Sequence, residues 1–375
     1  MLKKLNIAMI GTGGMCKYHS YGFKIADHFF DLDIKICLKL LVGRSADKKN
    51  LAKKYGFEKY STNIDDAFKD DIDLVDIITP NYLHIRLVKK AAAANKIIFC
   101  EKPIGMNFKE ALEGYREVEK NKVLNCVNFN FRKATPIALI KDIIEKKKIG
   151  KIYTFKIDFL ADDGSDISNP ISWFYQKEFS GGGANYDLNV HLVDLAHFLV
   201  GDIESITSLQ KTFIKERKSA DGKGMETVDT DDYTACLANF KNGAVGIFDA
   251  SRISTGDRLE SSLSIRGSRG AVKWDYQNFN FIELYLTGGS DIDGFRKVYT
   301  TEPDFPYMDG YYGMAGHGHH YDCLIVHQVY DLLRSISHNK MPSPNFKDGL
   351  KAQQVLEAIK ISHKERRWVE TKEII

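Results

Sequence analysis

Hydrophobic and polar positions along the first third of the chain predict strands and helices in alternation. Apolar runs such as 5–10, 36–43 and 97–100 are short, and each is followed by a stretch in which apolar residues recur every three or four positions. Strands joined by helices in this order form a parallel sheet with helices on both faces. We therefore predict a doubly wound α/β domain over residues 1–130.

The pattern changes after residue 130. A helix is predicted at 136–147 and another after the glycines at 181–183, and strand candidates with alternating apolar and polar residues then follow. Turn signals such as Asn242-Gly243 separate these strands, which favours antiparallel pairing. Residues 131–375 are thus predicted to form a second α/β domain with a large, mostly antiparallel open sheet. The strand candidates are 151–162, 205–214, 232–240, 243–252, 259–267, 270–276 and 280–286.

The overall composition is that of an ordinary globular protein, with 43% hydrophobic and 27% charged residues among 375. The net charge of +3 is small and the lysines are scattered, so neither nucleic acid nor a membrane is expected as a partner. No apolar run approaches the roughly 18 residues that a membrane span needs. The six cysteines form no CxxC pair, which fits reduced thiols and predicts a cytoplasmic protein.

A glycine-rich turn, Gly11-Thr12-Gly13-Gly14-Met15-Cys16, joins the first predicted strand to the first helix. Glycines at this place permit a tight turn and let backbone N–H groups approach a pyrophosphate at the helix N-terminus. The context matches the dinucleotide fingerprint of a Rossmann domain, although Cys16 replaces the third glycine. We predict a dinucleotide cofactor bound through Gly11, Gly13, Gly14 and Met15.

The end of the second strand is where a Rossmann domain recognises the adenosine ribose. Here the sequence is Val42-Gly43-Arg44-Ser45-Ala46-Asp47, with no acidic residue at the strand tip. Arg44 and Ser45 have the chemistry to hold a 2′-phosphate, whereas Asp47 is a weaker candidate for binding a 2′-hydroxyl. The sequence leaves the choice between NAD and NADP open.

The motif Glu101-Lys102-Pro103 directly follows the apolar strand at 97–100. Ligands of a doubly wound sheet lie beyond the carboxyl ends of its strands, so Lys102 is placed to donate a hydrogen bond to a substrate oxygen and to stabilise developing alkoxide charge. The alternative interpretation is that Lys102 is an ordinary surface lysine at the start of a loop. Thr79-Pro80-Asn81 and His84 follow the preceding strand, and we expect them to line the nicotinamide side of the cleft. The alternative for His84 is a structural role, as a contact at the start of a helix.

Asp187 and His191 lie four residues apart, just after the three glycines at 181–183. If the stretch opens a helix, the two share a face, and the carboxylate can orient the imidazole and stabilise its protonated form, as in a general base. The alternative is structural, because leucines at 188, 192, 195 and 199 form an apolar helical stripe beside them. Lys102 and the dinucleotide turn favour the catalytic interpretation.

Five motifs are similar, in order and spacing, to those of the Gfo/Idh/MocA family of NAD(P)-dependent oxidoreductases. They are GTGGM at 11–15, TPNYLH at 79–84, EKP at 101–103, NFNFR at 128–132 and GGGANYDLNVH at 181–191. The resemblance covers essentially the whole chain. It implies that Lys102 polarises the reacting oxygen, that His191 is the acid/base, and that Asp187 supports it or contacts substrate. It also implies a homo-oligomer, a dimer or tetramer, formed through the open C-terminal sheet.

More narrowly, residues 173–202 resemble the branch of levoglucosan and inositol dehydrogenases, whose members oxidise a secondary ring hydroxyl of a sugar or cyclitol. We expect this chemistry here, in reversible form. One alternative is an enzyme that oxidises a glycoside only transiently to permit bond cleavage. Another is a noncatalytic sensor or repressor of the same fold, although a pure binder has no need of Lys102, Asp187 and His191 together.

Departures from the family pattern concern the substrate pocket. Asn189 stands where the family commonly has glycine, and Asn185-Tyr186 replace smaller residues. Polyol recognition needs donors and acceptors on a concave surface, and Trp173 can also stack on the C–H face of a sugar, with ordinary packing as its alternative. The substrate candidates are Lys102, Asp158, Asp162, Trp173, Tyr186, Asp187, Asn189 and His191.

Two further segments carry chemistry-bearing side chains. In NFNFR, Asn130 and Arg132 are predicted cofactor contacts, and for Arg132 a substrate contact or a structural salt bridge is the alternative. The segment 316–320, GHGHH, has three imidazoles close to Asp322. We expect no metal there, because hydride transfer in this family requires none, and interpret the segment as a loop with polar contacts near the cleft.

Overall fold

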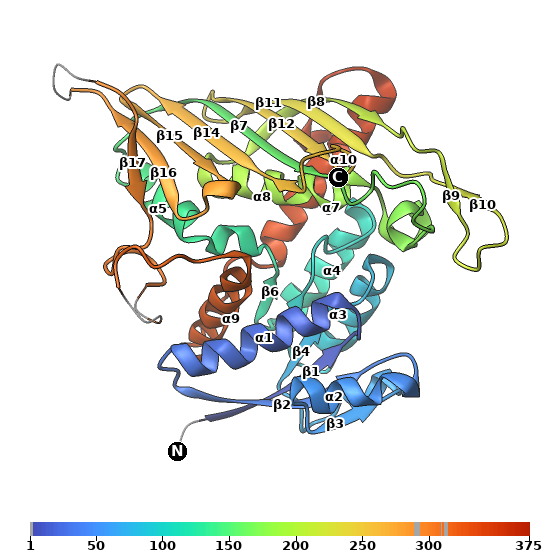
Figure 1. Ribbon diagram of the computed structural model, residues 1–375. Coiled ribbons are helices and arrows are strands. Elements are labelled where there is room, and N and C mark those ends of the chain that lie inside the picture. The colour runs from blue at the N-terminus through green and yellow to red at the C-terminus, as the bar shows by residue number, and fades with distance from the viewer. Residues whose placement is uncertain (1–2, 289–292, 309, 311–313) are drawn as a thin grey trace.

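The computed structural model describes residues 3–288, 293–308, 310 and 314–375. Its N-terminal part is a parallel six-stranded sheet in the order β3-β2-β1-β4-β5-β6 (Figure 1). This is the order of the predicted doubly wound Rossmann sheet, and the prediction is confirmed. Its strands are β1 (Lys3–Ile10), β2 (Ile34–Val42), β3 (Lys59–Ser61), β4 (Leu74–Ile77), β5 (Ile97–Cys100) and β6 (Asn125–Val127), and its helices are α1 (Gly14–Phe29), α2 (Lys49–Tyr55), α3 (His84–Ala93) and α4 (Phe108–Asn121).

Both faces of this sheet are buried, as the apolar strands require. Along β1, Leu5, Ile7 and Met9 pack in the cluster with α1, whereas Ala8 and Ile10 pack in the cluster with α3 and α4. The helix α9 (Tyr321–Ser337) belongs to the first cluster and packs along α1. A helix from the far end of the chain therefore completes one layer of the N-terminal sheet.

The C-terminal part is a large sheet in the order β17-β16-β15-β14-β7-β12-β11-β8-β18, with β13 beside β7. All neighbours are antiparallel except β7 and β12, so the predicted mostly antiparallel sheet is confirmed. The strands are β7 (Ile152–Ala161), β8 (Ile203–Lys211), β11 (Tyr233–Phe240), β12 (Val245–Ser251), β13 (Leu259–Glu260), β14 (Ser262–Gly267), β15 (Gly270–Asp275), β16 (Phe281–Leu286), β17 (Arg296–Tyr299) and β18 (Val369–Glu370).

Helices cover one face of this sheet, between it and the Rossmann part (Figure 1). A separate two-stranded hairpin projects beyond the large sheet (Figure 1). The helices are α5 (Thr135–Glu145), α6 (Lys177–Ser180), α7 (Ala184–Asp187), α8 (Asn189–Leu199) and α10 (Phe346–Glu365), and the hairpin strands are β9 (Glu216–Lys218) and β10 (Met225–Thr227).

The helix predicted after the glycines is interrupted. Leu188 ends α7 and precedes α8, with φ −102° and ψ −53°. The amide N–H of His191 donates to the Leu188 carbonyl at 3.0 Å, a three-residue spacing that tightens this turn. Asp187 and His191 therefore lie on consecutive helices rather than on one.

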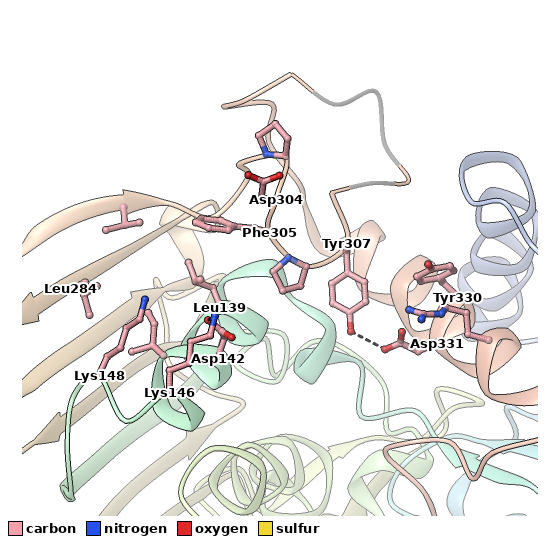
Figure 2. A pocket seen from close by; sticks show the side chains of 15 residues that line it. Leu139, Asp142, Lys146, Lys148, Leu284, Asp304, Phe305, Tyr307, Tyr330 and Asp331 are labelled. Carbon is pink, nitrogen blue, oxygen red and sulfur yellow. Dashed lines mark hydrogen bonds and ion pairs between the residues drawn. The ribbon is translucent and has the colours of Figure 1, made fainter. Parts of the chain in front are cut away.

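A hollow of about 750 Å³ lies away from the predicted site, between α5, the strands β16 and β17, and α9 (Figure 2). At one side of it the Tyr307 hydroxyl donates to Asp331 at 2.8 Å. No predicted site residue lines this hollow. Of the helices in the described part of the chain, none combines the length and apolar character needed to span a lipid bilayer.

Candidate active site

A cleft of about 920 Å³ lies between the two parts of the chain, at the carboxyl ends of β1, β2, β4 and β5. The Rossmann part contributes the glycine turn and the residues after those strands. The C-terminal part contributes α7, α8 and the aromatic pair Trp173 and Phe174. This is the place where ligands of doubly wound sheets bind.

The glycine turn fits a dinucleotide. Gly11 has φ +134°, and a Cβ on it would lie 2.8 Å from the Ile78 carbonyl oxygen, so a side chain is excluded. At Gly13 and Gly14 a Cβ would meet nothing within 4 Å, which leaves room for a ligand. Gly13 precedes α1 without a side-chain cap, so the first N–H groups of this helix are available to an anion such as pyrophosphate.

Most of the predicted cofactor contacts line this cleft, and two do not. His84 and Arg132 lie elsewhere, and for both the structural alternative holds. The predicted residues that line the cleft are Gly11, Gly13, Gly14, Met15, Arg44, Ser45, Thr79, Pro80, Asn81, Glu101, Lys102 and Asn130.

His84 is fully buried at the start of α3. Its Nδ1 lies 2.8 Å from the Pro103 carbonyl oxygen and its Nε2 lies 2.8 Å from that of Thr79, so the ring ties together the loops after β4 and β5. Arg132 binds Asp194 through two nitrogens, at 2.6 and 2.8 Å, and Asp348 at 3.2 Å. Such a fork is a strong structural ion pair, and it holds Arg132 away from a cofactor.

Lys102 and Asp187 form an ion pair in the cleft. Lys102 Nζ lies 2.7 Å from Asp187 Oδ1 and 2.9 Å from the Asp187 carbonyl oxygen. Burial lowers the pKa of Lys102, but the charges of Asp187 and Glu101 outweigh burial and raise it. Burial raises the pKa of Asp187, and Lys102 outweighs it, so that pKa is lowered. The ammonium and the carboxylate are therefore both charged at neutral pH.

His191 lines the same cleft and is packed among aromatic rings, with its centroid 5.0 Å from that of Phe131. Burial, followed by the charge of Lys102, lowers its pKa to about 3. Its Nδ1 is buried without a hydrogen-bond partner among the described residues, so the expected Asp187 contact is absent and that carboxylate binds Lys102 instead. The imidazole is therefore uncharged at neutral pH.

Behind Lys102 lies a buried charged network that the sequence did not reveal. His19 on α1 has Nδ1 3.0 Å from Asp76 and Nε2 2.9 Å from Glu101, and Asn128 donates to Glu101 at 2.8 Å. Burial disfavours the charged form of His19, but the two carboxylates outweigh it and raise its pKa to about 10. The other Glu101 oxygen accepts from the Lys102 backbone N–H at 3.1 Å. The network therefore fixes the Lys102 backbone relative to the helix of the glycine turn.

The predicted substrate residues divide in two. Lys102, Trp173, Asp187 and His191 line the cleft, but Asp158, Asp162, Tyr186 and Asn189 do not. Tyr186 and Asn189 are buried in the core, on either side of the break at Leu188. Asp158 accepts from the Ser262 backbone N–H at 2.6 Å, and Asp162 pairs with Arg258 at 3.6 Å. Asn185, expected to shape the pocket, is also buried and donates to the Leu356 carbonyl at 3.3 Å.

Several residues that line the cleft were not foreseen. Tyr321, at the start of α9, reaches it from the far end of the chain, and its ring stacks on Tyr18 at 5.2 Å. None of the residues 316–320 lines the cleft, and the described residues contain no group of three His, Cys, Asp or Glu side chains placed to hold a metal. The position of Tyr321 directly after that histidine-rich segment was the available signal. The other lining residues not predicted include Thr12, Lys48, Thr62, Tyr82, Asn128, Phe131, Phe159 and Phe174.

Comparisons with known proteins agree with this geometry. Residues 5–129 match the oxidoreductase family with an NAD-binding Rossmann fold, and residues 137–273 match the GFO/IDH/MocA C-terminal domain. The levoglucosan dehydrogenase of Pseudarthrobacter phenanthrenivorans is 31% identical over 389 aligned residues, which cover 100% of both chains. The myo-inositol 2-dehydrogenase of Thermotoga maritima is 24% identical, covering 99% of this chain and 100% of the relative.

Solved structures are similar over the same length. A levoglucosan dehydrogenase in complex with NADH and L-sorbose has a TM-score of 0.95 at 31% identity, covering 98% of this chain and 99% of that one. An oxidoreductase domain protein from Kribbella flavida has a TM-score of 0.95 at 34% identity, covering 98% of this chain and 99% of that one. With both domain models matched and a relative similar from end to end, this chain belongs to the Gfo/Idh/MocA family of NAD-binding oxidoreductases.

Proposed function

We propose that this protein is a dehydrogenase that reversibly oxidises a secondary ring hydroxyl of a sugar, anhydrosugar or cyclitol to a ketone, with NAD or NADP. The observation that carries the proposal is the cationic Lys102, held 2.7 Å from Asp187 beside a neutral His191, in the cleft that the glycine turn also lines. A cation and a proton acceptor at one substrate oxygen are what alcohol oxidation requires.

Each side chain has one task in this mechanism. Lys102 donates a hydrogen bond to the substrate oxygen and stabilises the alkoxide as it develops. His191 accepts the hydroxyl proton, and in the reverse direction its protonated form returns it. Asp187 keeps the Lys102 ammonium in place and charged. A nicotinamide dinucleotide held by the glycine turn would supply the hydride acceptor.

The aromatic side of the cleft suits a sugar ring. Trp173 and Phe174 stack on one another with centroids 3.8 Å apart, and Tyr321 lies with Lys102 and His191 among the lining residues. Aromatic faces bind the C–H surface of a sugar, while the polar groups bind its hydroxyls. Two relatives are named for levoglucosan and myo-inositol, which supports a cyclic polyol as substrate.

The direct test is a panel of cyclitols, anhydrosugars and glycosides assayed with NAD and with NADP at 340 nm. We expect steady formation of reduced cofactor with at least one cyclic polyol. Cleavage of a glycoside without accumulation of reduced cofactor would support transient oxidation instead. Binding of polyol and cofactor with no turnover would support a sensor or repressor.

Arg44 is expected to govern the use of NADP. Arg44, Ser45 and Lys48 line the adenosine end of the cleft, while Asp47 accepts from Ser45 and pairs with Lys48 at 3.7 Å. Losing a charge-assisted hydrogen bond costs roughly 1.5–3 kcal/mol, so Arg44→Ala should lower kcat/KM for NADP about tenfold or more and leave that for NAD nearly unchanged. Lys49→Ala, at an exposed position outside the cleft, is the matched control. Equal losses with both cofactors would contradict the assignment.

We also propose a homo-oligomer formed through the uncovered face of the large sheet. On this face Leu237 and Ile247 stand opposite one another in β11 and β12, with 49% and 46% of their surface exposed. Leu209 and Val245 extend the apolar strip at 59% and 47% exposed. A contiguous apolar strip on a sheet face is typical of an interface.

Ile247→Lys should therefore dissociate the oligomer. A charge in an apolar interface is desolvated without a partner, which costs several kcal/mol. Light scattering should give a dimer or tetramer for the wild type and a smaller species for the variant. The loop variant Ile167→Lys, at a position 67% exposed, should leave the mass unchanged. A monomeric wild type would rule out the proposal.

A further inference from the structure

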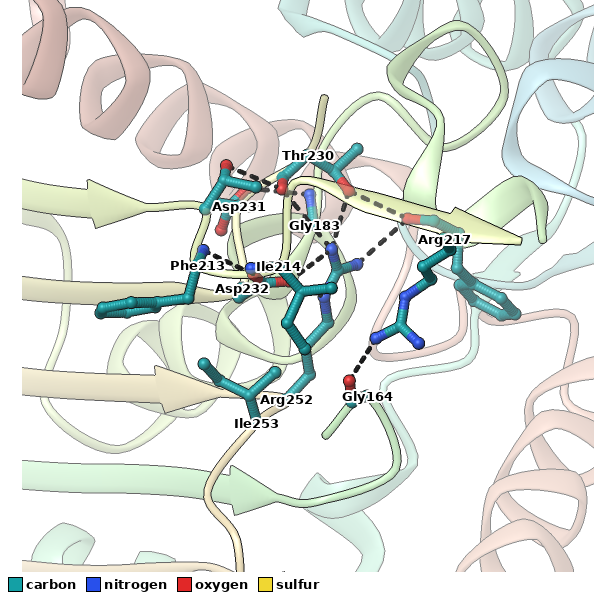
Figure 3. A network of polar contacts seen from close by, with 12 residues as sticks. Gly164, Gly183, Phe213, Ile214, Arg217, Thr230, Asp231, Asp232, Arg252 and Ile253 are labelled. Atoms are coloured by element: carbon teal, nitrogen blue, oxygen red, sulfur yellow. Dashed lines mark hydrogen bonds and ion pairs between the residues drawn. The ribbon is translucent and has the colours of Figure 1, made fainter. Parts of the chain in front are cut away.

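Two acidic residues, Asp231 and Asp232, are neighbours in the chain just before β11 and take part in one network of polar contacts behind the cleft residues (Figure 3). Neither is among the residues that line the cleft. Asp231 contacts the start of the glycine-led helix. Asp232 contacts Arg252 and also accepts from the backbone N–H groups of Phe213 and Ile214, at 2.7 and 2.9 Å.

Asp231 holds the turn that leads to Asp187. Its Oδ1 accepts from the Gly183 N–H at 2.8 Å and its Oδ2 from the Asn185 N–H at 2.7 Å, so it caps the start of α7. Its carbonyl oxygen accepts from the Ala184 N–H at 2.8 Å. A Cβ at Gly183 would lie 1.8 Å from that oxygen, so only glycine permits this approach. Because α7 ends at Asp187, Asp231 sets the place of the carboxylate that binds Lys102.

Asp232 is linked through Arg252 to the aromatic segment of the cleft. Asp232 is fully buried and lies 3.0 Å from Arg252 Nε and 2.9 Å from Nη2. Arg252 Nη1 then donates to the Phe174 carbonyl at 3.1 Å, and Nη2 donates to Thr230 Oγ1 at 2.9 Å. Phe174 and its neighbour Trp173 form the aromatic wall of the cleft. The fork of Arg252 therefore fixes the backbone of that wall.

A second buried arginine fixes the same loop. The guanidinium groups of Arg217 and Arg252 lie 4.1 and 4.5 Å from the ring centroid of Tyr175. Arg217, on the hairpin strand β9, also donates to the Asp166 carbonyl at 2.7 Å and to the Gly164 carbonyl. A buried cation needs its partners in place, so the two arginines tie down both ends of the segment from 164 to 176.

We propose that Asp231 and Asp232 are positioning residues that act on separate steps, with Asp231 setting the reactive geometry of Lys102 and Asp187 and Asp232 setting the aromatic wall that binds and selects the substrate ring. The proposal rests on the proposed function for its kinetic test. The separation follows from the contacts, since Asp231 reaches α7 and Asp232 reaches Arg252.

The test compares Asp231→Asn with Asp232→Asn, two changes of one atom in adjacent residues. An amide nitrogen cannot accept a hydrogen bond, so Asp231→Asn frees one end of the α7 turn. A displacement of the reacting groups by about 1 Å costs up to about a hundredfold, so kcat should fall tenfold or more, with the substrate KM within about threefold. Asp232→Asn should raise KM about tenfold and change the ranking of substrates, with kcat within about threefold. Affinity for NADH, measured by fluorescence, should stay the same in both.

Equal effects of the two variants on kcat and on KM would overturn the proposal, because a merely structural pair would change both constants in the same way in both variants. If either variant fails to fold, a milder one replaces it. Thr234→Val removes only the hydroxyl that donates to Asp231 at 2.8 Å, and Arg252→Lys keeps the charge beside Asp232 but removes the fork. The same separation of kcat and KM is expected from this second pair.

Hydrogen exchange gives a readout that needs no substrate. Asp231→Asn should speed exchange in 181–192 and leave 164–176 protected, and Asp232→Asn should do the reverse. Exchange that rises in both segments in both variants would overturn the proposal even if the wild type proves inactive on every polyol. If each variant speeds exchange only in its own segment but the wild type oxidises no polyol, the proposed function alone would be rejected.

Discussion

The Lys102→Met variant is expected to lose about a thousandfold in kcat, the upper range for removing one donor from a developing oxyanion. Methionine has a similar length and shape but no charge. Without the ammonium, the Asp187 carboxylate would lie uncompensated beside the substrate oxygen, where it repels the alkoxide as it forms. The loss should fall on kcat more than on KM, because the charge develops only in the transition state.

Two controls separate this effect from misfolding and from the role of His191. The circular dichroism spectrum should stay that of the wild type, which excludes misfolding as the cause of the loss. His191→Ala should lower kcat less, by about a hundredfold, the usual size of an acid/base contribution. A Lys102→Met enzyme that keeps kcat within about tenfold would show that another group stabilises the alkoxide.

The parts of the site adjacent in sequence to strong motifs could be predicted. The glycine turn follows a strand and opens a helix, and Lys102 follows a strand directly, so sheet topology alone places both in the cleft. The four-residue spacing of Asp187 and His191 was correct as a sign of the site but wrong as a contact. Leu188 breaks the helix between them, and the nearby Lys102 is the stronger partner for the carboxylate.

The parts that depend on tertiary packing could not be predicted. Tyr186 and Asn189 flank the acid/base residues in sequence, yet they face the core, because the direction of each side chain depends on where the helix breaks. Tyr321 lies more than a hundred residues from the other lining residues, and only the packing of α9 on α1 brings it to the cleft. His19 meets Asp76 and Glu101 only once α1, β4 and the loop after β5 have packed together.

Mild acid is expected to destabilise the fold strongly, because several histidines are buried in neutral form. Burial is the main cause in each, and it lowers the pKa of His191 and His327 to about 3 and of His197 and His319 to about 4, from an ordinary value of 6.5. In the unfolded chain these rings take up protons near pH 6.5, whereas in the folded chain they do not. Stability is therefore intact above pH 6.5 and is lost as the pH falls from 6.5 toward 4.

The size of this effect follows from linkage. Each buried histidine contributes up to about 1.4 kcal/mol per pH unit in that window, so four together approach the whole free energy of unfolding, about 5–15 kcal/mol, within two or three pH units. Burial raises the pKa of Asp194 to about 6. Its protonation in the folded chain therefore adds stability as the pH falls and partly offsets the loss. His19 leaves it unchanged, because the stability from its pKa of about 10 is fully present below pH 6.5 and is lost only as the pH rises toward 10.

Urea unfolding at pH 7.5 and pH 5.0 measures how far the free energy of unfolding falls between the two pH values. The variant His197→Gln isolates the contribution of one buried histidine. The glutamine does not titrate, so this variant should lose about 2 kcal/mol less than the wild type between the two pH values, whatever its stability at pH 7.5. His28→Gln, at an exposed position in the last turn of α1, is the matched control and should follow the wild type. Unfolding free energies that fall in parallel in all three proteins would mean that carboxyl groups, rather than the buried imidazoles, control the response to acid.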